Sequence, residues 1–158
     1  MNAHWLSRRT AILAAALVLL TGPVPQALAE PLLVDVFKTR GCGCCVLWIR
    51  HLEENGFETR SEDMIPGMLM RYKLDSGVPQ EMVSCHTGRI GGYVIEGHVP
   101  ARDILRLLDE QPDAIGLSVP GMPYGSPGMG PEDERDAYDV YLIRKDGSTE
   151  VFTSYPGA

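Results

Sequence analysis

Three cysteines lie within four residues, in a glycine-rich loop between an apolar segment and an amphipathic one. Residues 32–37, Leu-Leu-Val-Asp-Val-Phe, are mostly apolar and partly β-branched, which predicts a buried strand. Residues 45–55 follow the loop with apolar side chains at helical spacing and end at Asn-Gly, which predicts a helix. The chain is therefore expected to place Cys42, Cys44 and Cys45 where a buried strand meets the start of a helix.

The later segments complete a mixed α/β pattern. Further strands are expected at residues 57–60, 81–84, 92–96, 140–143 and 150–153, and further helices at residues 65–74 and 101–111. A turn is expected at Thr87-Gly88. Residues 112–136 are rich in Pro and Gly and are expected to form a long irregular loop. Asp146-Gly147 is a typical hairpin turn and joins the last two strands.

This order of elements resembles the thioredoxin fold, in which the reactive cysteine lies between the first strand and the following helix. A proline before the third strand, often with a cis peptide bond, lies against that cysteine in the fold. Here that proline would be Pro79, beside the loop of Cys42, and a cis Val78–Pro79 bond is a hypothesis that only this resemblance supports. The expected architecture is a thioredoxin-like mixed sheet flanked by helices over residues 30–112. Residues 113–158 are expected to form a C-terminal extension with the Pro/Gly/Met loop and a β-hairpin, packed on the same domain.

The first 29 residues have the features of a cleaved secretory signal peptide. Arg8 and Arg9 precede an apolar run, and Ala27-Leu28-Ala29 is a typical cleavage site. The alternative is a membrane anchor, but the run of about 13 apolar residues is shorter than the roughly 20 that cross a bilayer. We therefore expect cleavage after Ala29, no membrane attachment afterwards, and export to an oxidising compartment.

The charge of the chain argues against two classes of partner. It has 14 Lys and Arg residues against 21 Asp and Glu residues, and a formal net charge of -7. A nucleic-acid binder needs a basic face to neutralise phosphates, and a membrane-surface module needs a polybasic patch. We therefore expect neither nucleic acid nor a lipid surface as a partner.

Cys42 and Cys45 have the spacing of a C-x-x-C pair at a helix start, where backbone N–H groups and the helix dipole stabilise a thiolate. Cys44 lies between them and competes with the pair by exchange, which suits a simple dithiol catalyst poorly. Thiolates favour Cu(I), zinc and iron–sulfur centres and can bridge metal ions, so the three thiols favour metal binding. If the site acts by disulfide exchange instead, Cys42 is the nucleophile and Cys45 the resolving thiol. Four cysteines allow three pairings, of which Cys42–Cys45 is favoured.

Cys85 follows the strand expected at residues 81–84 and supplies the fourth thiol. In a thioredoxin-like sheet that strand is a neighbour of the first one, so we expect Cys85 to join the other thiols. The alternative is a buried structural cysteine. His86 and His98 are weaker candidate metal ligands, because a single histidine in a turn is more often structural. His51 is expected on the first helix, facing solvent.

Two Pro-Gly-Met units lie seven residues apart in the Pro/Gly-rich segment and carry Met122 and Met129. A thioether is a Cu(I) ligand, and a methionine in a polar loop buries little surface, so both are candidate copper ligands. The alternative is a tight turn that tucks each methionine into the core. Zinc would prefer four closed Cys and His ligands and would leave these methionines unexplained. The other methionines in predicted helices and strands are expected to pack in the core: Met64, Met68, Met70 and Met82.

Four motifs occur in the order that is typical of a known family. They are Arg40-Gly41-Cys42-Gly43-Cys44-Cys45, Ser84-Cys85-His86-Thr87, Glu96-Gly97-His98-Val99-Pro100 and Gly121-Met122-Pro123-Tyr124-Gly125-Ser126-Pro127-Gly128-Met129. From Leu33 to Tyr155 the chain resembles the exported CopG-type copper-resistance proteins of Gram-negative bacteria. These are C-x-C-C metal-binding proteins long described as a domain of unknown function. Gly130-Pro131 departs from the family pattern, where an acidic residue is more usual.

The resemblance implies a periplasmic protein with a thioredoxin-like domain and several copper ions, bridged by the sulfurs of Cys42, Cys44, Cys45 and Cys85. It also implies that the Pro-Gly-Met loop contributes to metal binding. The family is proposed to interconvert Cu(I) and Cu(II) and to assist copper efflux, so periplasmic efflux components are expected partners. Whether the chain is an enzyme, a copper oxidoreductase, stays open. Two alternatives also stay open: a module that hands copper on without a change of oxidation state, and a thioredoxin-like oxidoreductase that uses Cys42 and Cys45.

Overall fold

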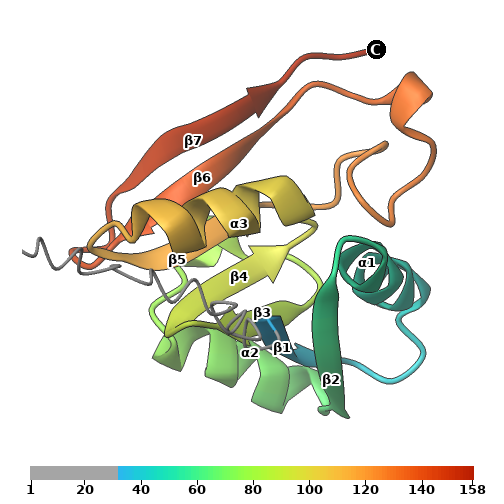
Figure 1. The fold of residues 1–158 in the computed structure, drawn as a ribbon. Helices are drawn as coiled ribbons and strands as arrows, with labels where there is room; N and C mark the ends of the chain where they lie inside the picture. Colours follow the sequence, from blue (N-terminus) through green and yellow to red (C-terminus); the bar gives the residue numbers. More distant parts are fainter. Residues whose placement is uncertain (1–31) are drawn as a thin grey trace, which may run out of the picture.

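Residues 32–158 of the chain are described by a computed structural model (Figure 1). The signal peptide expected at residues 1–29 lies outside this range. Within the described range, no helix is both long enough and apolar enough to cross a membrane.

Strands and helices alternate along residues 32–158, with two short 3-10 helices, η1 and η2, between them. In chain order the elements are β1 Leu32–Lys38, α1 Gly43–Glu54, β2 Phe57–Asp63, α2 Pro66–Asp75, η1 Gln80–Met82, β3 Thr87–Ile90, β4 Tyr93–Gly97, α3 Ala101–Glu110, β5 Ala114–Val119, η2 Glu132–Glu134, β6 Tyr138–Arg144 and β7 Thr149–Tyr155. All three expected helices form close to their expected bounds, as do the first two and the last two expected strands.

The seven strands of the described residues belong to one mixed sheet in the order β2-β1-β3-β4-β5-β6-β7. β1 and β2 are parallel, as are β4 and β5, and the other neighbouring pairs are antiparallel. The mixed α/β architecture expected from the sequence is therefore confirmed. The first four strands and the three helices follow one another as β-α-β-α-β-β-α, which is consistent with a thioredoxin-like arrangement. β6 and β7 form the expected C-terminal hairpin.

The core lies on both faces of this sheet. α1 and α3 pack on one face, where Trp48 and Leu107 join the larger apolar cluster together with Ile95 of β4. Val94 precedes Ile95 in the strand, so its side chain points to the opposite face, where it packs with Val78 in a smaller cluster. Figure 1 shows α2 and α3 on opposite sides of the sheet. The central strands are thus covered on both faces.

The cysteine loop sets the start of α1. Cys42 has an extended backbone, and its carbonyl accepts the N–H of Val46 at 3.3 Å, so the helix begins directly after it. Gly41, with a φ of 77°, makes the turn that precedes Cys42. Asn55 and Gly56 end the helix, as the sequence indicates. The three adjacent cysteines therefore occupy the N-cap and the first turn of α1.

The strand expected at residues 81–84 is wrong. Residues 80–82 form η1, and β3 begins only at Thr87, where the sequence indicates a turn. The reason is that a side chain competes for the backbone: the N–H of Ser84 donates to the Glu96 carboxylate at 2.7 Å instead of pairing with a strand. The apolar residues of this segment pack against the smaller core cluster without sheet pairing.

The expected cis Val78–Pro79 bond is also wrong, because residues 32–158 contain no cis peptide bond. Pro79 is the N-cap of η1, with a φ of -61° and a ψ of 148°. The chain turns instead at Gly77, whose φ of 86° suits glycine. Val78 then donates its N–H to the carbonyl of Lys73 at 3.1 Å, which closes the end of α2.

The sequence indicates one long irregular loop at residues 112–136, and this prediction is wrong. β5 lies within them and pairs with both β4 and β6, so it continues the sheet to the hairpin. A Cβ atom at Gly116 of β5 would lie 1.8 Å from the carbonyl oxygen of Val94, so glycine permits the close approach of β4. The Pro/Gly/Met segment is limited to residues 120–131, which we call the Met loop.

Candidate metal centre

Three segments of the chain meet at one end of β1, β3 and β4. Phe37 near the end of β1 pairs with Thr87 at the start of β3, so the residues just before β3 lie beside the cysteine loop. Thr87 also pairs with Glu96 of β4, which places the residues after β4 at the same end. The register of the sheet therefore brings Cys85 and His98 to the start of α1.

Four sulfur atoms lie together at this point. The Sγ atom of Cys44 is 3.6 Å from that of Cys42 and 3.8 Å from that of Cys85. The Sγ atom of Cys85 is also 3.8 Å from that of Cys45. All four Sγ atoms lie within 4.8 Å of one another. The structure thus brings together the four thiols that the sequence assigns to one site.

Cys42 and Cys45 are joined by a disulfide, with their Cα atoms 5.3 Å apart. Cys44 and Cys85 are free thiols. This pairing is the one that the C-x-x-C spacing favours, and it is the oxidised state of the pair. Cys45 is buried, whereas the other three cysteines are half-buried, so solvent reaches part of the cluster.

His98 presents a lone pair to Cys85. Its Nδ1 atom is 2.8 Å from the carbonyl oxygen of Pro127, and a carbonyl only accepts hydrogen bonds, so Nδ1 carries the proton. The neutral ring then has its lone pair on Nε2, which lies 3.0 Å from the Sγ atom of Cys85. A histidine that binds a metal through one nitrogen usually donates its other N–H in this way. His98 therefore has the orientation of a metal ligand.

His86 is the second imidazole beside Cys85, with its Nδ1 atom 3.1 Å from the sulfur. Its ring centroid lies 4.2 Å from that of Trp48 and 4.9 Å from that of His98. Its Nε2 atom is the one buried side-chain N or O atom of residues 32–158 that has no hydrogen-bond partner. Within this range, the Nε2 atom of His86 therefore has no hydrogen-bond partner like the carbonyl that Pro127 provides to His98. The ligand atoms of Cys85 and both histidines nevertheless lie within 4.8 Å of one another and form a second donor group.

Burial sets the protonation of these side chains. It raises the pKa of Cys85 to about 12, and the nearby Cys44 thiol adds to the rise. Burial also lowers the pKa of His98. The pKa of His86 is held well below its usual value by burial, and by the neighbouring His98 and Lys73. At neutral pH Cys85 and both imidazoles are therefore uncharged, and a metal ion that binds Cys85 must displace its proton.

A buried ion pair lies next to Cys85, and sequence reasoning missed it. Lys73 of α2 is 2% exposed and Glu96 of β4 is fully buried, and the lysine Nζ atom donates to the carboxylate at 2.7 Å. The Thr87 hydroxyl accepts from Lys73 at 2.9 Å and donates to the second carboxylate oxygen at 2.7 Å. The same carboxylate accepts the N–H of Ser84. The ion pair thus fixes the backbone directly before Cys85.

The Met loop is hydrogen-bonded to two of the three segments that form the centre. The hydroxyl of Ser84, directly before Cys85, donates to the carbonyl of Gly121. The carbonyl of Pro127 accepts the Nδ1 proton of His98. The loop is therefore fastened both before β3 and after β4.

Gly128 brings the Met loop against the third segment, the first turns of α1. A Cβ atom at this position would lie 2.8 Å from the carbonyl oxygen of Cys44 and 2.8 Å from the backbone nitrogen of Trp48. Its φ of 86° is also a left-handed value that favours glycine. A larger residue here would have to move the loop or the helix.

The Gly128→Val change is expected to lower the free energy of unfolding by about 1–3 kcal/mol through backbone strain alone, with the clash against α1 adding to it. Urea unfolding of the apoprotein measures the effect. The matched control is Gly121→Val in the same loop, where φ is 69° but a Cβ atom meets nothing within 4 Å. Equal destabilisation by the two changes would contradict the contact between the loop and α1.

The two methionines of the loop differ in exposure. Met122 is 55% exposed, whereas Met129 is half-buried. Met122 directly follows Gly121, which is bonded to Ser84, and Met129 directly follows Gly128, which lies on α1. Both thioethers are therefore carried by residues next to the points where the loop is fastened.

Three expectations for other side chains are wrong. His51 does not extend into solvent, because its Nε2 atom accepts the N–H of Ala101 at 3.1 Å and so caps the start of α3. Met68 and Met70 are 57% and 43% exposed, because α2 is a surface helix that buries only two of its residues. Met82 does pack against the smaller core cluster.

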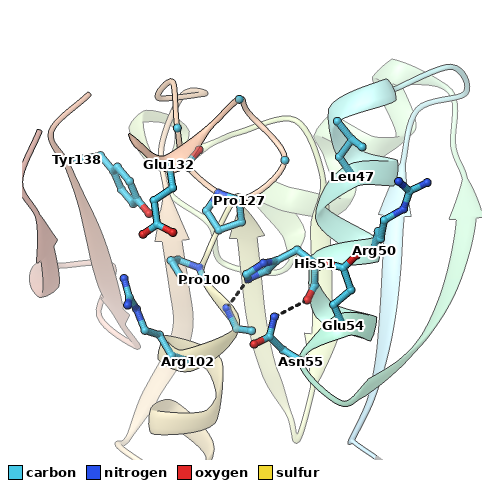
Figure 2. A pocket seen from close by; sticks show the side chains of 15 residues that line it. Leu47, Arg50, His51, Glu54, Asn55, Pro100, Arg102, Pro127, Glu132 and Tyr138 are labelled. Atoms are coloured by element: carbon cyan, nitrogen blue, oxygen red, sulfur yellow. Dashed lines mark hydrogen bonds between the residues drawn. The ribbon is translucent and has the colours of Figure 1, made fainter. Parts of the chain in front are cut away.

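A cleft of about 550 Å³ borders the centre, between α1, the start of α3 and the Met loop (Figure 2). Charged side chains of both signs line it: Arg50, Glu54, Arg102 and Glu132. Among the described residues that line it there is no cysteine, so the cleft is separate from the four-sulfur cluster. Pro127 lines the cleft and also holds His98, so the two sites share this residue.

Comparison with known protein families gives a match to part of this region. A family model described as a protein of unknown function, DUF411, matches residues 82–129. The matched residues include Cys85, both histidines beside it and both methionines of the Met loop. No curated protein gives a significant match to the chain.

Two solved structures resemble this chain over most of its length. Both are named copper resistance protein CopG, one as form 1 and the other as form 2, and each is 48% identical to this chain. Form 1 matches 81% of this chain with a TM-score of 0.75, and form 2 matches 80% with a TM-score of 0.74. Each is matched over 100% of its own length. The chain therefore belongs to the CopG family of copper-resistance proteins.

Proposed function

We propose that the chain binds copper ions through the sulfurs of Cys42, Cys44, Cys45 and Cys85. One observation carries the proposal: these four sulfurs and the lone pair of His98 converge at the start of α1. The similar solved structures are named copper resistance proteins, which supports copper as the ion. Binding through Cys42 and Cys45 requires that the disulfide between them is reduced, since the thiolate is the metal ligand.

The residues present fit copper ions. Thiolates and thioethers are donors that select Cu(I), and imidazole also suits copper. Two sulfurs that bind one ion at about 2.3 Å can be at most about 4.6 Å apart. The sulfur–sulfur distances of 3.6–3.8 Å lie within that limit. Because Cys85 belongs to both donor groups, its sulfur is placed to bridge ions, which favours several ions per chain.

The wider ligand set that we propose includes side chains beyond the four cysteines. His98 supplies a lone pair whose direction is fixed by Pro127. Met122 and Met129 supply thioethers from the Met loop, and His86 is a further imidazole donor. This assignment makes the loop, in the C-terminal extension at residues 113–158, complete a centre that is built on residues 30–112.

We propose a role in copper resistance outside the cytoplasm. The pattern of residues 1–29 supports export, and the family name supports copper resistance. A centre that combines thiolates with imidazoles has donors for both Cu(I) and Cu(II), which supports interconversion of the two oxidation states. A periplasmic efflux component would then receive the ion.

Residues 30–158, reduced and loaded with Cu(I) without oxygen, are expected to retain several copper ions per chain after desalting. The reason is that each ion is bound by several of the four thiols and the imidazole of His98 at once. Copper is measured by mass spectrometry of the metal, and accessible thiols are counted in parallel, with protection of all four expected. Loading with zinc is the control for general thiol binding. No retained copper with four reactive thiols would contradict the proposal.

A second candidate function is thiol–disulfide exchange, which the disulfide between Cys42 and Cys45 at the start of α1 favours. It predicts reduction of the disulfides of insulin. That activity should survive the Cys44→Ser and Cys85→Ser changes, because neither thiol would take part. Measuring insulin reduction and copper retention on the same variants separates the two functions.

A further inference from the structure

The oxidised cysteine pair and the donors that remain beside it indicate two different tasks within the centre. We infer that Cys42 and Cys45 are the electron source for reduction of cupric ions, and that Cys85 and His98 hold the cuprous product. The inference rests on the copper binding proposed above. It adds a reaction, thiol-driven reduction of Cu(II), and assigns its two halves to different residues.

The first support is the state of the centre when the pair is oxidised. With Cys42 and Cys45 joined, Cys44 and Cys85 are still free thiols. The ligand atoms of Cys85 and the two imidazoles beside it lie within 4.8 Å of one another in this same state. Oxidation of the pair therefore leaves free thiols and two imidazoles in place to hold Cu(I).

The second support is that the pair is placed for disulfide formation, whereas Cys85 is engaged elsewhere. The Cα atoms of Cys42 and Cys45 are 5.3 Å apart, within the ordinary range for a disulfide. The Cys85 sulfur lies 3.0 Å from the Nε2 atom of His98 and 3.1 Å from the Nδ1 atom of His86. A disulfide through Cys85 would compete with both contacts.

The third support is the short path between the two halves. The Sγ atom of Cys44 lies 3.6 Å from that of Cys42 and 3.8 Å from that of Cys85. An ion at Cys42 can therefore reach Cys85 by exchange of one sulfur ligand for the next. Cys42 of the pair is half-buried, whereas Cys45 and His98 are fully buried. A solvated ion thus meets Cys42 before it meets the buried imidazole of His98.

The reaction balances with two cupric ions and one dithiol. Each Cu(II) ion takes one electron and becomes Cu(I). The S–H bonds of Cys42 and Cys45 break, one S–S bond forms between them, and two protons pass to solvent. The oxidant is the substrate itself, so one turnover requires no other reactant.

Anaerobic addition of copper(II) sulfate to the fully reduced chain, residues 30–158, tests the inference. The reaction is stopped with a thiol-alkylating reagent and a Cu(II) chelator, Cu(I) is counted with bicinchoninate, and disulfides are mapped by peptide mass spectrometry. We expect two Cu(I) ions per disulfide, with the Cys42–Cys45 disulfide in at least about tenfold excess over any other pairing. A mixture of disulfides, or a dominant one that contains Cys85, would overturn the inference.

Two variants test the two halves separately. Cys42→Ser removes a half-buried thiol of the pair and is expected to lower the yield of Cu(I) from Cu(II) at least about tenfold. Cys45→Ser, at the buried position, is the second variant should the first disturb the fold. His98→Gln is expected to speed the transfer of bound Cu(I) to bicinchoninate by about 10–100-fold. Transfer at the unchanged rate would overturn the role of His98 in holding the product.

Direct loading with Cu(I) distinguishes failure of this inference from failure of the proposed function. A reduced protein that does not retain Cu(I) contradicts copper binding itself. A protein that retains Cu(I) but forms no Cys42–Cys45 disulfide with Cu(II) contradicts only the reduction.

Discussion

Replacement of Lys73 by methionine is expected to lower the free energy of unfolding by about 3–5 kcal/mol, because it leaves a buried charge without a partner. Lys73 is 2% exposed and is the counter-charge of the fully buried Glu96. Methionine is of similar length, so the change removes mainly the charge. Burial already raises the pKa of Glu96 while Lys73 opposes the rise, and the variant loses that opposition. Urea unfolding at neutral pH measures the loss.

The same helix offers a matched control. Arg71→Met removes an exposed ion pair with Asp75 and is expected to cost less than about 1 kcal/mol. The double change Lys73→Met with Glu96→Gln removes both buried charges and should recover most of the lost stability. The loss of unfolding free energy caused by Lys73→Met should also become smaller as the pH falls through the raised pKa of Glu96, because the protonated carboxyl carries no charge. If Lys73→Met lowers the free energy of unfolding no more than Arg71→Met does, the stabilising role of the buried ion pair is contradicted.

The Cys85→Ser change is expected to lower the copper retained per chain at least about tenfold. Cys85 is the one residue that belongs to both donor groups of the described structure, so its loss weakens both. A serine hydroxyl is a hard donor and does not replace a thiolate for Cu(I). Copper per chain is measured after Cu(I) loading and desalting in the presence of bicinchoninate, with urea unfolding of the apoprotein as the control for the fold.

Cys44→Ser provides the comparison within the cluster. Cys44 belongs to one donor group only, so its loss should lower copper retention less than the loss of Cys85. Equal losses in the two variants would contradict the central place of Cys85. Full copper stoichiometry in Cys44→Ser would count against a cluster bridged by this sulfur.

The cysteine loop could be predicted from the sequence because local signals agree there. An apolar strand, glycines around the cysteines and an Asn55-Gly56 stop are all short-range features, and β1 and α1 form where they indicate. The proximity of Cys85 to this loop could be predicted from the order of strands in a thioredoxin-like sheet. It holds even though the strand before Cys85 does not form, because β3 still pairs with β1.

β3 and β5 show where local signals fail. Thr87-Gly88 has the composition of a turn, yet Gly88 lies within β3. A Cβ atom there would be 3.2 Å from the Val34 side chain and 3.3 Å from that of Trp48, so tertiary packing selects the glycine. β5 is a short strand stabilised by partners on both sides. Neither packing nor partners are visible in a short sequence window.

The polar contacts of the centre lie further beyond sequence reasoning. Lys73 and Glu96 are 23 residues apart, and only the meeting of α2 with β4 joins them. Glu96 follows Val94 and Ile95 in an apolar strand, but this pattern does not identify the partner of its carboxylate. His86 and His98 look alike in the sequence. What distinguishes them is the hydrogen bond of His98 to the backbone carbonyl of Pro127, 29 residues later. A sequence motif does not predict such a contact with a distant backbone group.

The attachment of the Met loop has a consequence for the thermodynamics of metal binding. The loop holds His98 through Pro127 and lies against the backbone of Cys44 through Gly128. The conformational entropy of these donors is therefore lost when the apoprotein folds, before any ion arrives. An incoming ion meets a preorganised site, so its binding free energy is not consumed in ordering the ligands. The stability of the apoprotein and its affinity for metal are thus linked through one loop.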